Sequence, residues 1–418
     1  MPNKVLKVWR TAAAAILTSA VLAVALASSA PAQSFSVVYS FTGGGDGGYP
    51  LAGVTVDRSG NLYCTTSAGG TSNRGAACKL TRQGSGWTYK NLYSFAAGSD
   101  ASTPIARAVF GPDGTLYGAT EFGGRNCGGN AGCGTVYRLQ PPPGVCKTSL
   151  CFWTETILYR FSGGSDGANP GYGDVVYDAS GNLYGTTFYG GINAQGVVFK
   201  LTRSGNSWTE SVIHTFTGPD GINPFSGLTA DSAGNFYGTT NAAGASGYGT
   251  VYELSPSGGN WTENTLYSFA LASSGGNPYG GVIVDSTGNL FGATSAGGTG
   301  NGGTVYELAQ SGGGWTFDLL YSFSGNTYQP GSYGNLAQDA AGNLYGTTRN
   351  DGANGVGSIF KLTPSGSGWT YTSLHDFTGG SDGGNPYGNL AFDADGNLFG
   401  TAKVGGAHGF GVVWEITP

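Results

Sequence analysis

A run of fourteen residues is written seven times along this chain, and its spacing restricts what the chain can fold into. The copy at 285–298 reads DSTGNLFGATSAGG. Its turn glycine has a counterpart in every copy, at Gly60, Gly114, Gly181, Gly234, Gly288, Gly342 and Gly396. The steps between these positions are 54, 67, 53, 54, 54 and 54 residues. A period this long and this regular is typical of solenoids, propellers and other repeat arrays.

Each period holds four strand signals. In the fifth copy they span residues 280–285, 289–295, 303–309 and 314–323, and we name them the first to fourth strands. The first two are joined by Asp-x-x-Gly-Asn, in which Asp can cap the turn and Gly can take a left-handed conformation. Four antiparallel strands per repeat, without helical periodicity, predict a propeller blade. Seven copies predict seven blades.

The two ends of the repeat region predict a closed ring. The sequence FSVVYSF at 35–41 matches a fourth strand alone, whereas GVVWEITP at 411–418 is a third strand with no fourth strand after it. The N-terminal strand can therefore complete the seventh blade and remove an exposed sheet edge. The fold class we predict is all-β, with one seven-bladed β-propeller over residues 33–418.

Residues 1–32 have the features of a secretory signal peptide. Lys4, Lys7 and Arg10 precede an apolar run at 12–27, and Ala30-Pro31-Ala32 forms a small-residue cleavage site. A membrane anchor is the alternative, but the run is short for a span. No second apolar run follows. We therefore expect a secreted or cell-surface protein with no membrane span after signal removal, with the periplasm as the alternative location.

Composition narrows the class of partner. The chain has 79 Gly, 24 Tyr, 21 Phe and 8 Trp, and this aromatic content argues against disorder. Its formal net charge is −6, and its pI is near 5.0. Nucleic-acid binding requires a basic face. We therefore expect no nucleic-acid partner, and nothing in the repeat pattern calls for more than a monomer.

One repeat carries a resemblance to a known family. Residues 159–202 contain YRFSGGSDGANP, then DASGNLYGTT, then GVVFKLT. This pattern resembles the GloVer tandem repeat of choice-of-anchor bacterial surface proteins, and it recurs over essentially the whole mature chain. The resemblance implies export and display at or near the cell surface, and it implies no catalytic residues. The sequence shows no sorting segment after Pro418, so we make no prediction of how the protein is attached.

Six cysteines in an exported chain suggest three disulfides. In six blades a Gly on the second strand is matched by an aromatic residue on the third, a cross-strand pairing that is known to stabilise sheets. In the first blade these two positions are Cys64 and Cys78, so we expect them to bond. The other four cysteines lie in the enlarged second repeat, where we expect local pairs or, as the alternative, a zinc site: Cys127 with Cys133, and Cys146 with Cys151.

Candidate catalytic residues are few, and we predict no catalytic group, cofactor or metal. His214 and His375 replace a Tyr that recurs in the fourth strands, which indicates a packing role, whereas His408 in a loop is not explained by the repeat. Two recurrent series of Asp residues precede turns, one of them in DADGN at 393–397. Calcium binding is the alternative there, but turn capping explains every copy.

One face of the disc should carry the variable loops. The blade crossovers and the loops between second and third strands share this face, and we call it the variable face. Charged residues break the sevenfold pattern there, at Arg107, Glu121, Asp174, Arg349, Asp351, Lys403 and His408. They are either ordinary solvated loop charges or ligand-binding residues, because varied loops on a constant scaffold commonly carry binding sites.

An apolar ring also recurs before the first strands, at Leu51, Ile105, Tyr172, Phe225, Tyr279, Tyr333 and Tyr387. It serves either packing between blades or, if exposed, stacking against sugars. We therefore predict a protein that binds an extracellular glycan or a surface protein through its variable face. The alternatives are a propeller enzyme (a lyase, lactonase or glycan-cleaving enzyme) with a site in the central channel, and a structural surface-coat protein.

Overall fold

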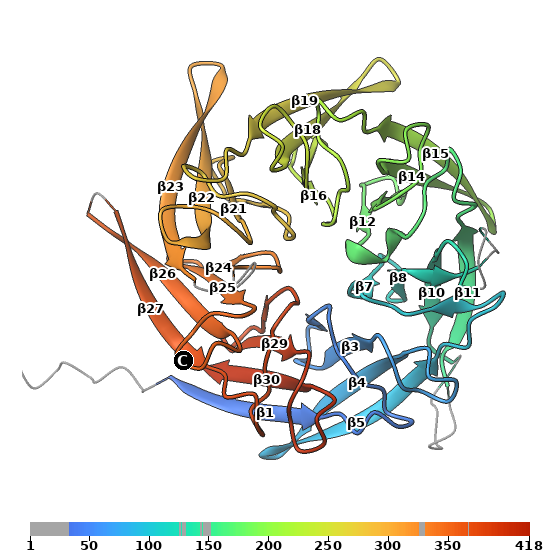
Figure 1. Ribbon diagram of the computed structural model, residues 1–418. Helices are drawn as coiled ribbons and strands as arrows, with labels where there is room; N and C mark the ends of the chain where they lie inside the picture. The colour runs from blue at the N-terminus through green and yellow to red at the C-terminus, as the bar shows by residue number, and fades with distance from the viewer. Residues whose placement is uncertain are drawn as a thin grey trace, which may run out of the picture.

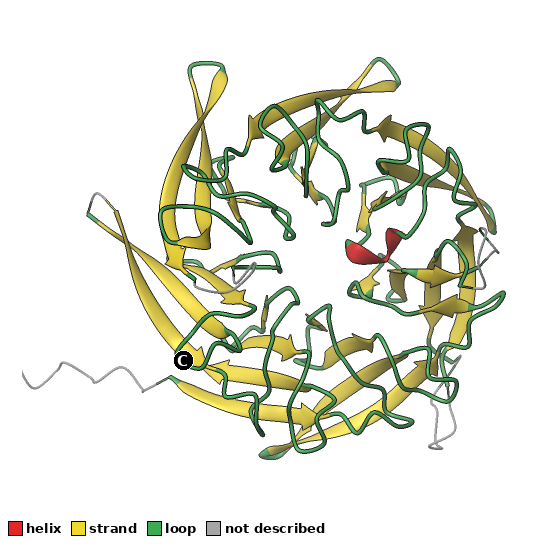
Figure 2. Ribbon diagram, in the orientation of Figure 1, coloured by secondary structure: helices red, strands yellow, loops and turns green. Residues whose placement is uncertain are grey.

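The structure is a computed structural model of the 418-residue chain, and it describes residues 33–124, 127, 131–142, 144, 152–325, 331–366 and 368–418. Over these residues the chain runs once around a ring of seven four-stranded antiparallel sheets (Figure 1). Apart from strands and loops, the described residues form one 3-10 turn, η1 (Pro170–Tyr172), near the centre of the ring (Figure 2). The predicted seven-bladed propeller is confirmed. The predicted signal peptide at 1–32 lies outside the described residues.

Each blade contains a first, a second, a third and a fourth strand, in that order outward from the axis. The first strands are β2 (Val54–Val56), β7 (Val109–Phe110), β12 (Val176–Tyr177), β16 (Thr229–Ala230), β20 (Ile283–Val284), β24 (Ala337–Gln338) and β28 (Ala391–Phe392). The second strands are β3 (Leu62–Thr66), β8 (Leu116–Thr120), β13 (Leu183–Thr187), β17 (Phe236–Thr240), β21 (Leu290–Ala293), β25 (Leu344–Thr348) and β29 (Leu398–Ala402). The third strands are β4 (Ala76–Gln83), β10 (Thr135–Gln140), β14 (Val197–Ser204), β18 (Thr250–Ser257), β22 (Asn301–Ser311), β26 (Ser358–Ser365) and β30 (Val412–Thr417). The fourth strands are β5 (Gly86–Ser94), β11 (Thr154–Arg160), β15 (Ser207–Thr215), β19 (Asn260–Ser268), β23 (Gly314–Ser324), β27 (Gly368–Asp376) and β1 (Ser34–Ser40).

The seventh blade is closed by the N-terminal strand. Its sheet order is β1-β30-β29-β28, and β1 pairs antiparallel with β30 from Ser34 opposite Thr417 to Ser40 opposite Val412. The residue after β1, Phe41, is fully buried with side chains of the first and seventh blades. Ring closure therefore joins the two ends of the repeat region by both hydrogen bonds and core packing.

The turn between the first and second strands explains why the fourteen-residue motif recurs in every blade. Gly60 has a φ of +75°, and its six counterparts have φ between +73° and +89°, a region in which residues with a Cβ are strained. The Asp57 carboxylate accepts hydrogen bonds from the Ser59 and Asn61 backbone N–H groups and from the Asn61 side chain. Burial alone would raise the pKa of Asp57, but these hydrogen bonds outweigh it and lower the pKa. The carboxylate is thus used by its own turn.

The predicted pairing of glycine with an aromatic residue is present in the register of the second and third strands. Gly118 lies opposite Tyr137, and a Cβ at Gly118 would come within 2.5 Å of the Tyr137 hydroxyl oxygen. The five other blades expected to have this pair also have it. In the first blade, Cys64 lies opposite Cys78, and the two form the predicted disulfide with a Cα–Cα distance of 5.1 Å.

The cysteines of the enlarged second repeat are described in part. Cys127 and Cys133 form the predicted local disulfide, with a Cα–Cα distance of 5.8 Å. Cys146 and Cys151 lie outside the described residues, so their predicted pairing stays a prediction. In the described part of the chain, no helix is long and apolar enough to cross a bilayer.

The hydrophobic core is divided among the interfaces between blades. Among the described residues, seven buried clusters each combine side chains of two neighbouring blades. One such cluster joins Phe161 of the second blade to Leu183 and Phe199 of the third. Since each blade buries its faces only against its neighbours, the stability of the ring depends on every interface being present.

Near the outer strands a polar contact supplements five of the interfaces, through Asp46, Asp100, Asp166, Asp220 and Asp382. The recurrent Tyr of the fourth strand donates its hydroxyl to the Asp of the following crossover, as Tyr39 does to Asp46 at 3.0 Å. His214 makes the same contact with Asp220 at 2.8 Å, and His375 makes it with Asp382 at 3.0 Å. The two histidines therefore replace Tyr as partners of the loop carboxylate, as their place in the repeat predicts.

In three neighbouring blades a glutamate faces this contact from the next fourth strand, namely Glu155, Glu210 and Glu263. Glu155 lies beside Asp100 and accepts a hydrogen bond of 3.4 Å from the Tyr93 hydroxyl. Burial, and then the neighbouring Asp100, raises the pKa of Glu155 to about 9. The ring therefore contains carboxyl groups that favour the protonated form.

Removal of β1 should open the ring. Deleting residues 34–41 from the mature chain exposes the edge of β30 and removes buried Phe41, whose loss alone is worth about 3–5 kcal/mol. We expect a lower melting temperature in calorimetry, with restoration by a synthetic peptide of residues 33–42 added in trans. A truncated chain that melts at the full-length temperature would contradict closure by β1.

Glu155 should make stability fall as pH rises. Its folded pKa of about 9 exceeds the value of an unfolded glutamate, so its contribution is complete below about pH 4.5 and is lost as pH rises towards 9. Urea unfolding should show Glu155→Gln more stable than wild type at pH 8, by at least about 1 kcal/mol, and equal to it at pH 5. Parallel pH profiles for the two proteins would contradict the assignment. Glu210, whose pKa is raised to about 7, acts in the same direction and stays intact in both proteins.

Candidate functional site

The variable face is organised by pairing between its two kinds of loop. In the second blade the crossover strand β6 (Ala101–Ser102) pairs antiparallel with β9 (Phe122–Gly123), which follows the second strand. Isolated bridges join the same two loops in five other blades, as between Gly48 and Ala68. In these blades each loop after a second strand is therefore hydrogen-bonded to the crossover of its blade. The crossover residues that follow this pairing lead to the first strand at the centre of the ring.

A cavity of about 980 Å³ lies on the axis and reaches this face. All seven members of the apolar ring predicted from the sequence line it, one from each blade: Leu51, Ile105, Tyr172, Phe225, Tyr279, Tyr333 and Tyr387. Its volume is in the range of small-molecule and cofactor sites, roughly 300–1,000 Å³. The apolar ring thus faces an open space as well as its neighbours.

Five aromatic residues of this ring form a continuous arc over the third to seventh blades. The ring centroids of Tyr172 and Phe225 are 4.2 Å apart, those of Phe225 and Tyr279 are 4.6 Å apart, and those of Tyr279 and Tyr333 are 4.2 Å apart. Tyr387 continues the arc at 4.8 Å from Tyr333. The same side chains therefore both pack between blades and line the cavity.

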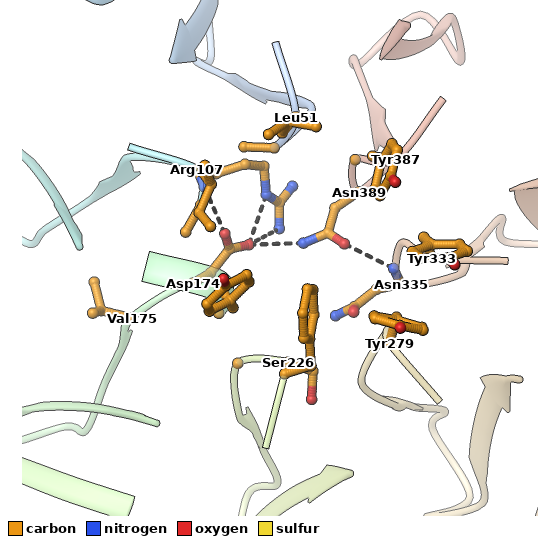
Figure 3. Close-up of a pocket in the computed structure, with 18 of the residues that line it drawn as sticks. Leu51, Arg107, Asp174, Val175, Ser226, Tyr279, Tyr333, Asn335, Tyr387 and Asn389 are labelled. Carbon is orange, nitrogen blue, oxygen red and sulfur yellow. Dashed lines mark hydrogen bonds and ion pairs between the residues drawn. The ribbon is translucent and has the colours of Figure 1, made fainter. Parts of the chain in front are cut away.

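An ion pair between neighbouring blades lies in the lining of the same cavity. Arg107 and Asp174 precede the first strands of the second and third blades (Figure 3). The Arg107 guanidinium donates from Nε and Nη2 to Asp174 Oδ2, each at 2.7 Å, and its backbone N–H donates to Oδ1 at 2.8 Å. The two side chains are only 22% and 13% exposed. The sequence singled out both residues, and the structure brings them together.

Two asparagines extend this ion pair into a polar floor. The Asn389 amide donates to Asp174 Oδ2 at 2.9 Å and accepts from the Asn335 backbone N–H at 2.7 Å, as Figure 3 shows. The side-chain Oδ1 of Asn335 in turn accepts a hydrogen bond from the Gly281 backbone N–H at 2.7 Å. The floor therefore links side chains of four blades with fixed donors and acceptors.

The asparagines are the members of the site that the sequence analysis missed. They occupy the position of Arg107 and Asp174 in their blades, which reads Gly53, Arg107, Asp174, Gly227, Gly281, Asn335 and Asn389 around the ring. The polar members of this series were the available signal, but asparagine in a glycine-rich turn is also an ordinary turn residue.

The rim of the cavity carries Glu121 and Lys403 at equivalent places in the second and seventh blades. Glu121 accepts a hydrogen bond of 2.8 Å from the Tyr172 hydroxyl; burial raises its pKa, and this hydrogen bond partly offsets the rise. Arg349 holds the same place in the sixth blade and lies over the rings of Tyr333 and Tyr387 that line the cavity. Glu121 and Lys403 therefore line the cavity, and Arg349 contacts two rings that line it.

Asp351 and His408 lie apart from the cavity lining. Asp351 is half-buried, and burial raises its pKa, as does the neighbouring charge of Asp376 on the outer strand β27. His408 is exposed at the tip of its loop. His408 therefore lies away from Arg107, Glu121 and Asp174, which line the cavity.

One cluster among the described residues has the composition of a metal site. The ligand atoms of His214, Asp220 and Glu263 lie within 4.8 Å of one another. The same His–Asp contact occurs at His375 and Asp382, where Phe35 stacks on the imidazole in place of a third ligand. The contact between blades therefore accounts for the His–Asp pair without an ion.

Together these features define a β-propeller built from tandem repeats, with an axial cavity that combines an aromatic arc and a polar floor. The chain belongs to the Gloeobacter/Verrucomicrobia repeat family, whose sequence model matches residues 25–152, 127–333 and 264–418. The resemblance to the GloVer repeat is thereby confirmed. A search of curated proteins found no match.

Solved propeller structures resemble the chain at low identity. A gluconolactonase from Xanthomonas campestris is 13% identical, with a TM-score of 0.39, and the match covers 63% of this chain and 75% of that protein. A candidate 6-phosphogluconolactonase from Bacteroides uniformis is 14% identical, with a TM-score of 0.48 and coverage of 77% and 83%. A candidate glucose dehydrogenase from Thermus thermophilus is 14% identical, with a TM-score of 0.42 and coverage of 92% and 99%. We transfer no activity from them.

The ion pair of the floor should be energetically coupled. Asp174→Ala leaves the Arg107 guanidinium in a mostly buried place without its carboxylate, which should lower the unfolding free energy by about 1–3 kcal/mol. In the double variant Arg107→Met with Asp174→Ala no charge remains, so its loss should be smaller than the summed losses of Arg107→Met and Asp174→Ala measured singly. Urea unfolding measures both quantities, and strict additivity would show that the pair is not coupled.

Proposed function

We propose that this protein is an exported glycan-binding propeller that holds a segment of a polysaccharide in its axial cavity. The observation that carries the proposal is the aromatic arc above a polar floor. A pyranose ring presents an apolar C–H face and a periphery of hydroxyl groups. An aromatic surface complements the face, whereas fixed amide, carboxylate and guanidinium groups complement the hydroxyls.

Binding is favoured over catalysis by the way the floor is occupied. Arg107 and Asp174 satisfy each other, and Asn389 adds a further hydrogen bond to the carboxylate. The floor therefore offers orientation more readily than a free acid, base or nucleophile. His408 lies outside the cavity lining.

Location outside the cytoplasm is supported by the disulfides. Cys64–Cys78 and Cys127–Cys133 form bonds that persist in oxidising compartments. The N-terminal sequence has the pattern of a signal peptide, and display near the cell surface is what the repeat family leads us to expect. A glycan in the wall, capsule or surrounding matrix would be accessible to a protein in that location.

The cavity should lose glycan affinity when the arc is shortened. Leu51 fills the ring position in the first blade, so Phe225→Leu and Tyr279→Leu introduce a residue that the scaffold already accepts. After a glycan array identifies a ligand, each variant should bind it about tenfold more weakly in calorimetry, since an aromatic contact contributes about 0.5–1.5 kcal/mol beyond its area.

The matched control is Tyr248→Ala, which removes a 36%-exposed ring in a variable loop outside the cavity lining. It should leave both affinity and melting temperature unchanged. Ligand binding that depends on Tyr248 but not on the arc would place recognition on the outer loops. Retention of a protein ligand and no glycan would replace the proposed function by protein binding.

A further inference from the structure

Two cations share one aromatic ring that lines the cavity. The Arg349 guanidinium carbon lies 4.8 Å from the centroid of Tyr387, and Lys403 Nζ lies 5.4 Å from the same centroid on the next blade. Arg349 also donates to the Tyr333 hydroxyl at 3.1 Å. Both positive charges are therefore held beside the part of the aromatic arc formed by the sixth and seventh blades.

Neither cation has an acidic partner in the described part of the chain. The ion pairs found there involve Arg107, Arg82 and the two histidines of the outer contacts. Burial lowers the pKa of Lys403, and the adjacent Arg349 charge lowers it further. Contact with the Tyr387 ring offsets part of this repulsion. The pair of like charges is otherwise uncompensated.

The carboxylates in this region are used elsewhere. Glu121, on the other part of the rim, accepts the Tyr172 hydroxyl, and Asp174 is paired with Arg107. Arg349 has in addition a buried Nε without a hydrogen-bond partner. The rim thus presents donors and positive charge whose natural complement is an anionic oxygen.

From this arrangement we propose that the glycan is anionic, and that its carboxylate or sulfate group binds Arg349 and Lys403 while its sugar ring lies on the aromatic arc. This inference rests on the proposed glycan function and adds the charge of the ligand to it. It also runs against the overall charge of the chain, which is −6, so general electrostatic attraction does not account for such binding. A local cationic pair is required.

The test uses polysaccharides that differ in charge alone. Pectate is compared with highly methyl-esterified pectin, and dextran sulfate with dextran, by affinity electrophoresis of the mature chain and by calorimetry. The first pair reports a carboxylate and the second a sulfate. At least one anionic polymer should bind at least tenfold more tightly than its neutral counterpart, and this preference should weaken with added salt.

Variants assign the preference to the two cations. Arg349→Gln and Lys403→Gln should each reduce affinity for the anionic polymer at least tenfold, whereas Lys403→Arg, which keeps the charge, should retain most of it. Lys361→Gln is the matched control, because Lys361 Nζ lies 5.4 Å from the ring of Tyr345 outside the cavity lining. It should leave affinity unchanged. Melting temperatures verify that every variant is folded.

Each result decides between the two proposals. Equal binding of the charged and neutral polymers, lost on Phe225→Leu, overturns the anionic ligand and leaves glycan binding standing. Anionic binding that survives both Gln variants or is lost in Lys361→Gln also overturns the assignment to Arg349 and Lys403. Failure of all four polymers and of the glycan array overturns both proposals.

Discussion

Every blade of this propeller depends on its neighbours for a hydrophobic core, and this mutual dependence is the constraint from which the site follows. A four-stranded sheet has two faces to bury and no helix to cover either of them. Phe161 packs against Phe199 across one interface, and an equivalent aromatic pair lies at five others; at the seventh interface Phe41 packs with the Cys64–Cys78 pair. Closure by β1 supplies the last interface, so that no blade is left with an open face.

Closure of the ring brings the first strands together at the axis. Their backbones approach so closely that a Cβ on Gly173 would lie 2.3 Å from the Gly227 nitrogen, and one on Gly388 would lie 2.1 Å from the Gly53 nitrogen. Residues that are more than fifty positions apart in sequence therefore meet around one point. The residues that follow Gly173 and Gly388, Asp174 and Asn389, project into the cavity (Figure 3).

The sequence predicted the fold well because the fold is local and repeated. Turn chemistry, strand order and the Cys64–Cys78 bond each follow from comparing one copy with the next. The sequence predicted the site only in part. The repeat shows which strand or loop of a blade carries a residue, but it does not show how far the side chain lies from the axis. Arg349 and His408 both break the sevenfold pattern, yet one stacks beside the cavity and the other lies exposed at a loop tip. The contact of Glu155 with Asp100 was likewise not foreseen, because it crosses between blades.

The asymmetry of the site is what a symmetric scaffold needs to recognise a directional ligand. Seven identical blades would offer seven equivalent orientations to a sugar chain, and none would be favoured. Here the aromatic arc covers the third to seventh blades, aliphatic Leu51 and Ile105 complete the ring, and the cations lie at the sixth and seventh blades whereas Glu121 lies at the second. A ligand with one charged end and one apolar face therefore meets a single complementary arrangement. Substitutions at a few axial positions can thus give orientation to the site while the packing between blades is preserved.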